Sequence, residues 1–206
     1  MMEMALSAVI GYCLGQLSPA AFISSMKKTD LRKHGTGNLG ATNTMLVFGK
    51  FYGIAVMIFD VLKSYIAIQI AKRLFPMFRL AGLIAGCMAV IGHIFPAYLN
   101  FQGGKGVAAF AGMILAYDVR ILFVLLMIAI LFMAVTDFGP WGPVSASVLF
   151  PLWLLFRVRD LMVFGGVAAV GGLIIYKHRV NFIRDRKGGE IHVSDFADRC
   201  GEFHQI

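Results

Sequence analysis

The stretch FYGIAVMIFDVLKSYIAIQIA, residues 51–71, decides the fold class of this chain. It is almost entirely apolar, and its length matches the roughly 20 residues that a helix needs to cross a bilayer. Its charged residues are Asp60 and Lys63, which stand three positions apart and would share one face of a helix. A charge at membrane depth is costly unless it is paired, so we interpret these two as a structural ion pair rather than as substrate ligands.

Other apolar runs of similar length follow along the chain. Of the 206 residues, 59% are hydrophobic and 15% are charged, which is far from the composition of a soluble domain. We therefore expect an all-α, polytopic integral membrane protein of about seven transmembrane helices, with residues 1–190 as one membrane domain and residues 191–206 as a short cytoplasmic tail. Several of the helices are short enough to be tilted or to span only partly. The expected helices are 4–25, 51–71, 80–98, 106–117, 121–136, 144–157 and 161–177.

Lysine and arginine residues are distributed unevenly between the loops. If the helices alternate in direction, twelve of the 19 basic residues lie on one face and six on the other. Since positive charge is retained in the cytoplasm, we expect the first face and the C-terminus to be cytoplasmic and the N-terminus to be outside. Basic residues also meet anionic lipid, so the net charge of +8 indicates membrane lipids and no nucleic acid as partners. The first apolar run follows Glu3 without a basic segment, which favours a retained span over a cleaved signal.

Three polar, glycine-rich segments interrupt the apolar sequence, and the first is HGTGNLGATNT, residues 34–44. Glycines permit positive φ, and short polar side chains add hydrogen-bond donors, so the loop can bind an anion through its N–H groups. A helix starting just after the loop would strengthen such a site. The alternative is a flexible connection between helices. The glycines are Gly35, Gly37 and Gly40, and the polar residues are Thr36, Asn38, Thr42 and Asn43.

The second segment, FQGGKGVA, places Lys105 between Gly104 and Gly106 at the expected start of a helix. A lysine there complements a phosphate or carboxylate that backbone donors hold. The segment is not a Walker P-loop, because Leu99 stands where the first glycine is required and Gly106 replaces the serine or threonine. Alternatively, Lys105 extends to lipid headgroups.

The third segment, HRVNFIRDRKGGE, follows the last expected span. On a continuing helix His178 and Asn181 would share a face, which predicts a second wall for an anion site. The alternative is contact of the basic residues with anionic lipid. His93, just before Pro96, is interpreted as a hydrogen-bonded structural histidine rather than a general base. The spacing of the cysteines and histidines indicates neither a metal site nor a catalytic triad.

The order and wording of these motifs resemble the acyl-phosphate-dependent glycerol-3-phosphate acyltransferases of bacterial membranes. The resemblance runs from about Leu14 to Glu190 through GTGNLGATN, DVLK, GHIFPAYLNFQGGKGVA and HRVNFIRDRKGGE. It implies a seven-helix enzyme of the bacterial inner (plasma) membrane with a cytoplasmic active face. Such an enzyme transfers a fatty acyl group from acyl phosphate to glycerol 3-phosphate for phospholipid synthesis, giving lysophosphatidate and phosphate without a metal or other cofactor.

The resemblance also assigns roles at matching positions. It implies catalytic roles for Lys105, His178, Asn181 and Thr36, where Thr36 stands in place of a serine. It implies that the two glycine-rich loops hold substrate phosphate. The phosphate-binding residues are Gly35, Gly37, Asn38, Gly40, Thr42, Gly104, Lys105 and Gly106.

Three positions depart from the family pattern. Leu46 replaces an arginine, Gln16 stands opposite a serine, and Asp137 replaces an arginine in the loop 137–143. Because a leucine cannot act as a bidentate phosphate ligand, these changes support an alternative. In that alternative the chain is a divergent paralogue that binds a phosphorylated lipid or metabolite and is inactive or uses a different acyl acceptor. A transporter is a third hypothesis, for which the charged pair in residues 51–71 is the only indication.

Overall fold

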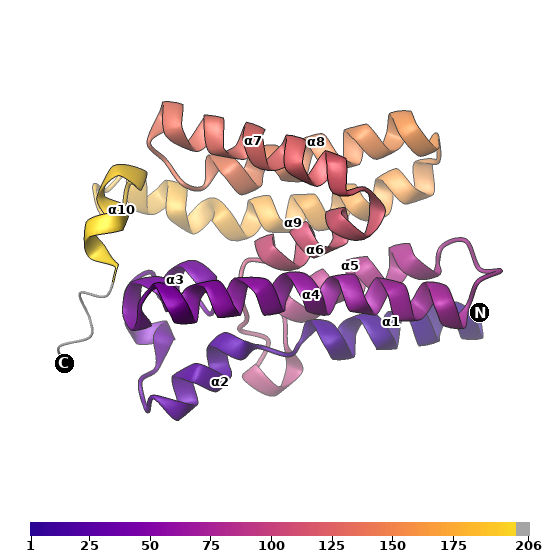
Figure 1. The fold of residues 1–206 in the computed structure, drawn as a ribbon, viewed down its shortest axis with the longest axis horizontal. Coiled ribbons are helices and arrows are strands. Elements are labelled where there is room, and N and C mark those ends of the chain that lie inside the picture. The colour runs from indigo at the N-terminus through magenta and orange to yellow at the C-terminus, as the bar shows by residue number, and fades with distance from the viewer. Residues whose placement is uncertain (201–206) are drawn as a thin grey trace. The chain divides into compact units, whose positions relative to one another are not determined.

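The computed structural model describes residues 1–200, and each regular element in that range is a helix (Figure 1). The chain forms two compact units, residues 1–116 together with the segment from Asp198, and residues 117–197. Within residues 1–200, six stretches are long and apolar enough to cross a membrane, and α6 is a shorter apolar helix. The all-α, polytopic expectation is therefore confirmed, with six candidate spans and one short helix making up the seven. The helices are α1 Met2–Gly15, α2 Pro19–Met26, η1 Leu31–Lys33, α3 Ala41–Phe48, α4 Lys50–Leu74, α5 Ala81–Ile94, η2 Ala97–Leu99, α6 Val107–Tyr117, α7 Val119–Thr136, α8 Trp141–Val158, α9 Leu161–Asp185 and α10 Val193–Arg199.

In the first unit α1, α4 and α5 pack against one another and lie side by side in Figure 1. Small residues let α1 and α5 approach to backbone contact. A side chain at Gly11 would overlap the backbone of Ala85, and one at Gly15 would overlap that of Ala89. Close packing of this kind is how helices associate in lipid, where apolar burial between helices gives no advantage over contact with lipid tails.

The first expected helix, 4–25, is in fact two helices. The break falls at residues 16–18, where Ser18 caps α2 by accepting a hydrogen bond from Ala21 N at 3.2 Å and Pro19 occupies the first helical position. Proline is suited to that position because its missing N–H would have no intrahelical partner there. Tyr98 Oη accepts a hydrogen bond from Ser18 N at 3.2 Å, so the break is held from η2.

The second unit contains α7, α8 and α9, with α8 packed against both other helices. Asp160 caps α9 by accepting hydrogen bonds from Met162 N and Val163 N at 2.8 and 3.2 Å. The expected end of this helix at residue 177 is wrong, because α9 continues to Asp185. The polar residues after 177 contain no glycine or proline before Gly188, so nothing in the local sequence terminates the helix earlier.

Candidate functional site

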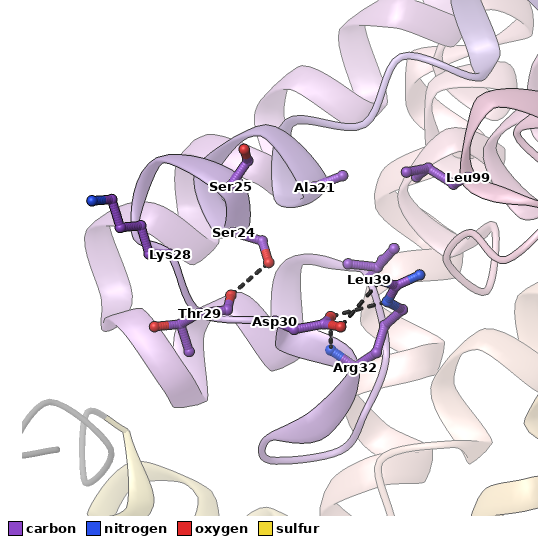
Figure 2. A pocket seen from close by; sticks show the side chains of 9 residues that line it. All are labelled: Ala21, Ser24, Ser25, Lys28, Thr29, Asp30, Arg32, Leu39 and Leu99. Atoms are coloured by element: carbon purple, nitrogen blue, oxygen red, sulfur yellow. Dashed lines mark hydrogen bonds and ion pairs between the residues drawn. The ribbon is translucent and has the colours of Figure 1, made fainter.

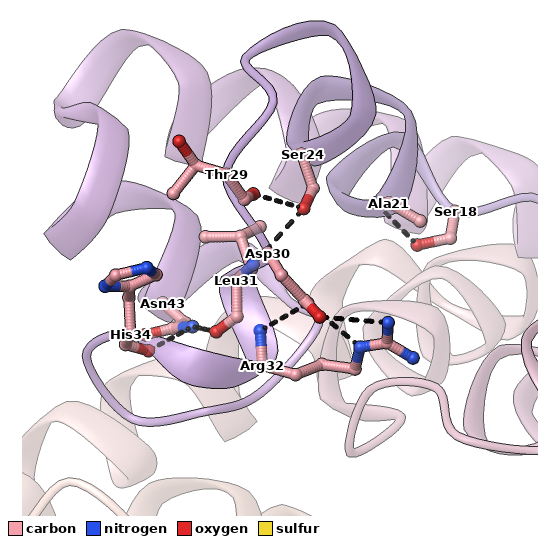
Figure 3. A network of polar contacts seen from close by, with 9 residues as sticks. All are labelled: Ser18, Ala21, Ser24, Thr29, Asp30, Leu31, Arg32, His34 and Asn43. Carbon is pink, nitrogen blue, oxygen red and sulfur yellow. Dashed lines mark hydrogen bonds and ion pairs between the residues drawn. The ribbon is translucent and has the colours of Figure 1, made fainter.

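The first glycine-rich segment forms a fixed loop that leads into α3. Asn43 lies in the first turn of α3, is fully buried, and points back at the loop, as Figure 3 shows. Its amide Nδ2 donates to Leu31 O at 2.8 Å and to His34 O at 3.1 Å, and its Oδ1 accepts from Thr36 N at 2.6 Å. One side chain therefore satisfies two backbone groups of the loop and one of η1, and the loop is not a flexible connection.

The glycines of this loop have different conformations. Gly35 has φ of +57° and Gly37 has φ of +72°, a region that favours glycine. The expectation of positive φ is wrong for Gly40, whose φ of −160° is that of an extended backbone. Gly40 directly precedes the first residue of α3. Gly40 O accepts hydrogen bonds from both Thr44 N and Thr44 Oγ1, at 3.0 and 2.9 Å. A helix does begin just after the loop, as an anion site of this kind favours.

A second layer of contacts supports the loop from α2 and η1 (Figure 3). Ser24 Oγ donates to Thr29 O at 2.6 Å and accepts from Leu31 N at 3.2 Å. Asp30 caps η1 and pairs with Arg32, with Arg32 Nε 2.9 Å from Asp30 Oδ1. The hydrogen bonds from Arg32 hold the pKa of the Asp30 carboxyl below its usual value.

A pocket of about 330 Å³ opens beside this layer (Figure 2). Its lining combines apolar and hydroxyl groups with Lys28 and with the ion pair of Asp30 and Arg32. None of the predicted phosphate-binding residues lines it, so the pocket is not the predicted site. The lining residues are Ala21, Ser24, Ser25, Lys28, Thr29, Asp30, Arg32, Leu39 and Leu99.

The second glycine-rich segment returns to the end of α5. Gly103 N donates to Ile94 O, and Gly104 N donates to His93 O, each at 3.1 Å. A side chain at Gly104 would press on Leu39 O, which belongs to the first glycine-rich loop. The two loops are therefore adjacent in the first unit. Lys105 is half-buried between the buried glycines Gly104 and Gly106, two residues before α6 begins.

A buried charged cluster lies behind the second loop. Lys63 Nζ is 2.6 Å from Asp60 Oδ1, which confirms the ion pair expected from their spacing. Lys63 Nζ also lies 2.9 Å from His93 Nδ1, which confirms that His93 is hydrogen-bonded; its structural role stays a prediction. The third contact of the ammonium is to Leu17 O at 2.7 Å, in the break between α1 and α2. All three side chains are at most 7% exposed.

In the second unit, His178 and Asn181 lie on α9 and are both buried, as expected for a shared helix face. His178 Nδ1 lies 2.8 Å from Ile174 O. Asn181 Nδ2 donates to Glu190 Oε1 at 2.6 Å, and Arg184 Nε lies 3.4 Å from Glu190 Oε2. The chain turns back after α9, so that Glu190 faces the helix that precedes it.

The three positions that depart from the family pattern, Leu46, Gln16 and Asp137, lie in different structural environments. Leu46 is 1% exposed and belongs to the core of the first unit. Gln16 is the residue that ends α1. Asp137, which ends α7, accepts hydrogen bonds from Ser194 N and Ser194 Oγ, both at 2.8 Å. These bonds from Ser194 lower the pKa of the Asp137 carboxyl.

The structure thus brings together the predicted residues of the two loops in one unit and those of α9 in the other. Sequence reasoning missed the role of Asn43, whose partners lie seven to twelve residues away. It also missed Glu190, although the third motif ends on that residue. The first group comprises Gly35, Thr36, Gly37, Asn38, Gly40, Thr42, Gly104, Lys105 and Gly106, and the second comprises His178 and Asn181.

Comparison with known proteins finds relatives of this chain in both sequence and structure. The glycerol-3-phosphate acyltransferase family model matches residues 5–188. A glycerol-3-phosphate acyltransferase of Staphylococcus saprophyticus is 33% identical over 197 residues, covering 92% of this chain and 97% of the relative. One from Prochlorococcus marinus is 36% identical, covering 90% and 95%. A crystal structure of an integral membrane glycerol 3-phosphate acyltransferase in its glycerol 3-phosphate form has a TM-score of 0.86 and 29% identity, covering 95% and 98%. The lysophosphatidic acid form has a TM-score of 0.79 and 28% identity, covering 92% and 94%.

Proposed function

The chain belongs to the glycerol-3-phosphate acyltransferase family, and we propose that it transfers a fatty acyl group from acyl phosphate to glycerol 3-phosphate. The products are lysophosphatidate and inorganic phosphate. The relative solved in its glycerol 3-phosphate form supports the acceptor. Similarity over nearly the full length of named acyltransferases favours this enzyme over a divergent binding paralogue.

The observation that carries the proposal is the meeting of the two glycine-rich loops. Gly104, next to Lys105, packs against Leu39 of the loop that Asn43 holds in place. Backbone N–H groups, small hydroxyls and an ammonium group from two adjacent loops form a donor set for phosphate oxygens. In this proposal, Thr36, Asn38 and Thr42 bind phosphate together with Lys105 and the glycines of both loops.

The chemistry requires a proton acceptor as well as phosphate binding. The glycerol hydroxyl oxygen attacks the acyl carbonyl carbon, the bond from that carbon to the phosphate oxygen breaks, and phosphate leaves with the bonding electrons. When His178 Nδ1 donates to Ile174 O, Nε2 is the nitrogen that can take the hydroxyl proton. Because acyl phosphate is already activated, a weak base such as His178 or a substrate phosphate is sufficient. Positioning the two substrates supplies much of the rate.

We place the enzyme in the bacterial plasma membrane with residues 1–190 as its membrane domain. The excess of basic residues supports a cytoplasmic active face, a cytoplasmic C-terminus and an N-terminus outside.

The test is release of inorganic phosphate by the purified full-length protein in detergent, given palmitoyl phosphate with and without glycerol 3-phosphate. We expect release that depends on glycerol 3-phosphate and a loss of about 100-fold or more in kcat/KM for Lys105→Ala. Lys50→Ala is the matched control, because Lys50 also follows a glycine at the start of a helix but is exposed. Normal turnover of Lys105→Ala would contradict the proposed phosphate site, and release independent of glycerol 3-phosphate would contradict the proposed acceptor.

A further inference from the structure

The buried cluster of Asp60, Lys63 and His93 has a defined pattern of hydrogen bonds. A lysine ammonium has three hydrogens and no acceptor. Lys63 Nζ donates to Leu17 O at 2.7 Å, lies 2.9 Å from His93 Nδ1, and forms an ion pair with Asp60 Oδ1 at 2.6 Å. His93 Nδ1 also lies 3.4 Å from Asp60 Oδ1, so both members of the ion pair contact the same ring nitrogen. These two contacts hold the orientation of the ring.

The opposite edge of the same ring faces the second glycine-rich loop. A side chain at Gly104 would overlap His93 Nε2, so the imidazole packs directly against the Cα of the residue before Lys105. The backbone carbonyl of His93 also accepts the hydrogen bond from Gly104 N. His93 thus contacts the loop twice, through its main chain and through a ring that Lys63 holds in place.

We propose that Asp60, Lys63 and His93 form a positioning unit that sets the conformation of the loop carrying Lys105. This inference rests on the proposed function, in which Lys105 binds substrate phosphate. His93 touches neither reacting group, and it acts through Gly104. The unit also joins the loop to the break between α1 and α2, because the Lys63 ammonium binds the carbonyl of Leu17.

The central variant is His93→Asn. An asparagine Oδ1 can take the place of Nδ1 as acceptor for Lys63, while the shorter side chain no longer reaches Gly104. We expect the midpoint of thermal unfolding to stay within a few degrees of wild type while the KM for glycerol 3-phosphate rises about tenfold with a smaller change in kcat. A fall in kcat alone would overturn the proposal.

A second readout needs no turnover, so it separates this inference from the proposed function. Trypsin cleaves after lysine, and its rate at Lys105 reports the order of the loop. We expect His93→Asn to raise cleavage after Lys105 about tenfold and to leave cleavage after Lys187 unchanged. An unchanged rate at Lys105, or an equal rise at both lysines, would overturn the positioning role. Absence of phosphate release by the wild-type protein would instead refute the proposed function and leave the proteolysis result standing.

The two glycines of the loop provide a matched pair for a double-mutant test. A methyl group at Gly104 overlaps the His93 ring and also meets Leu39 O, and only the first of these overlaps is relieved by His93→Asn. A methyl group at Gly103 instead meets the carbonyls of His93 and Ile94 and the ring of Pro96. His93→Asn should therefore restore about tenfold of the kcat/KM that Gly104→Ala loses, and restore nothing to Gly103→Ala. Equal restoration of both glycine variants, or of neither, would contradict direct contact through the ring.

Discussion

Replacing Asn43 with alanine removes the three hydrogen bonds that hold the first glycine-rich loop, and their surroundings give the size of the effect. Leu31 O lies in a fully buried residue and keeps only a long contact from His34 N at 3.4 Å. Leaving such a carbonyl without a good donor costs about 1–3 kcal/mol. His34 O and Thr36 N are half-buried and can bind water, so each lost bond there costs about 0.5–1.5 kcal/mol. The sum is a loss of about 2–6 kcal/mol of stability.

The same change should alter substrate binding, because the released loop carries six of the nine residues proposed to bind phosphate. We expect Asn43→Ala to raise the KM for glycerol 3-phosphate by about tenfold or more in the phosphate-release assay, alongside a lower midpoint of thermal unfolding. Asn43→Asp keeps the size of the side chain and the acceptor for Thr36 N but offers no donor to the two carbonyls, so it should be no better than alanine.

Thr44→Val is the matched control for Asn43. Thr44 is equally buried, but its hydroxyl bonds to Gly40 O, which Thr44 N also binds, so Gly40 stays held, and the loss should be about 1 kcal/mol with no change in KM. A wild-type KM and unfolding midpoint in Asn43→Ala would refute the idea that this side chain fixes the loop. Equal effects of Asn43→Ala and Thr44→Val on KM would refute it as well, because they would trace the defect to α3 rather than to the loop.

Three further predictions concern charge. Lys63→Met leaves the Asp60 carboxylate buried without its partner and should cost about 3–5 kcal/mol, whereas adding Asp60→Asn should recover most of the loss, both measured by thermal unfolding. The pKa of the Asp137 carboxyl is lower in the folded protein than in the unfolded chain, because the carboxylate accepts hydrogen bonds from Ser194 in segment 190–199. These bonds stabilise the fold fully above the unfolded-state pKa of Asp137, and the stabilisation is lost as pH falls through its folded-state pKa. Hydrogen-exchange protection of that segment should therefore fall below about pH 4, and Asp137→Asn should remove this step; an identical step in the variant would assign it to another group. Leu46→Arg restores the family's arginine but places a charge in the core, so it should lower the free energy of unfolding by about 3 kcal/mol or more. Leu46→Met is the control and should lower it by less than about 1.5 kcal/mol. Equal midpoints of thermal unfolding for the two variants would refute burial of this position.

The helices were predictable because lipid imposes a length and a composition on each span. Where the prediction failed, short-range signals were present but outweighed by the apolar pattern. The break in the first span has Ser18 as cap and Pro19 as first helical residue, yet the sequence on both sides is continuously apolar. The extension of α9 to Asp185 was missed because its last turns are polar.

The candidate site was predictable only to the extent that its residues are neighbours in sequence. Glycines beside small polar residues identified both loops, and the spacing of Asp60 and Lys63 gave their ion pair. The roles of Asn43, His93 and Glu190 depend on contacts that only packing creates. Asn43 reaches back across the loop, His93 meets Lys63 through the packing of α4 on α5, and Glu190 meets Asn181 through the turn after α9.

The close approach of α1 to α5 has a consequence for biogenesis. Gly11 and Gly15 are complementary to Ala85 and Ala89, which the ribosome makes about 70 residues later. The small-residue face of α1 therefore enters the bilayer before its partner exists and is covered by lipid in the meantime. The carbonyl of Leu17, between α1 and α2, accepts a hydrogen bond from Lys63 of α4, and Lys63 in turn contacts His93 of α5. This set of contacts is therefore complete only after α5 has been inserted. Insertion of α5 is thus the step that covers the small-residue face of α1 and brings His93 to Lys63.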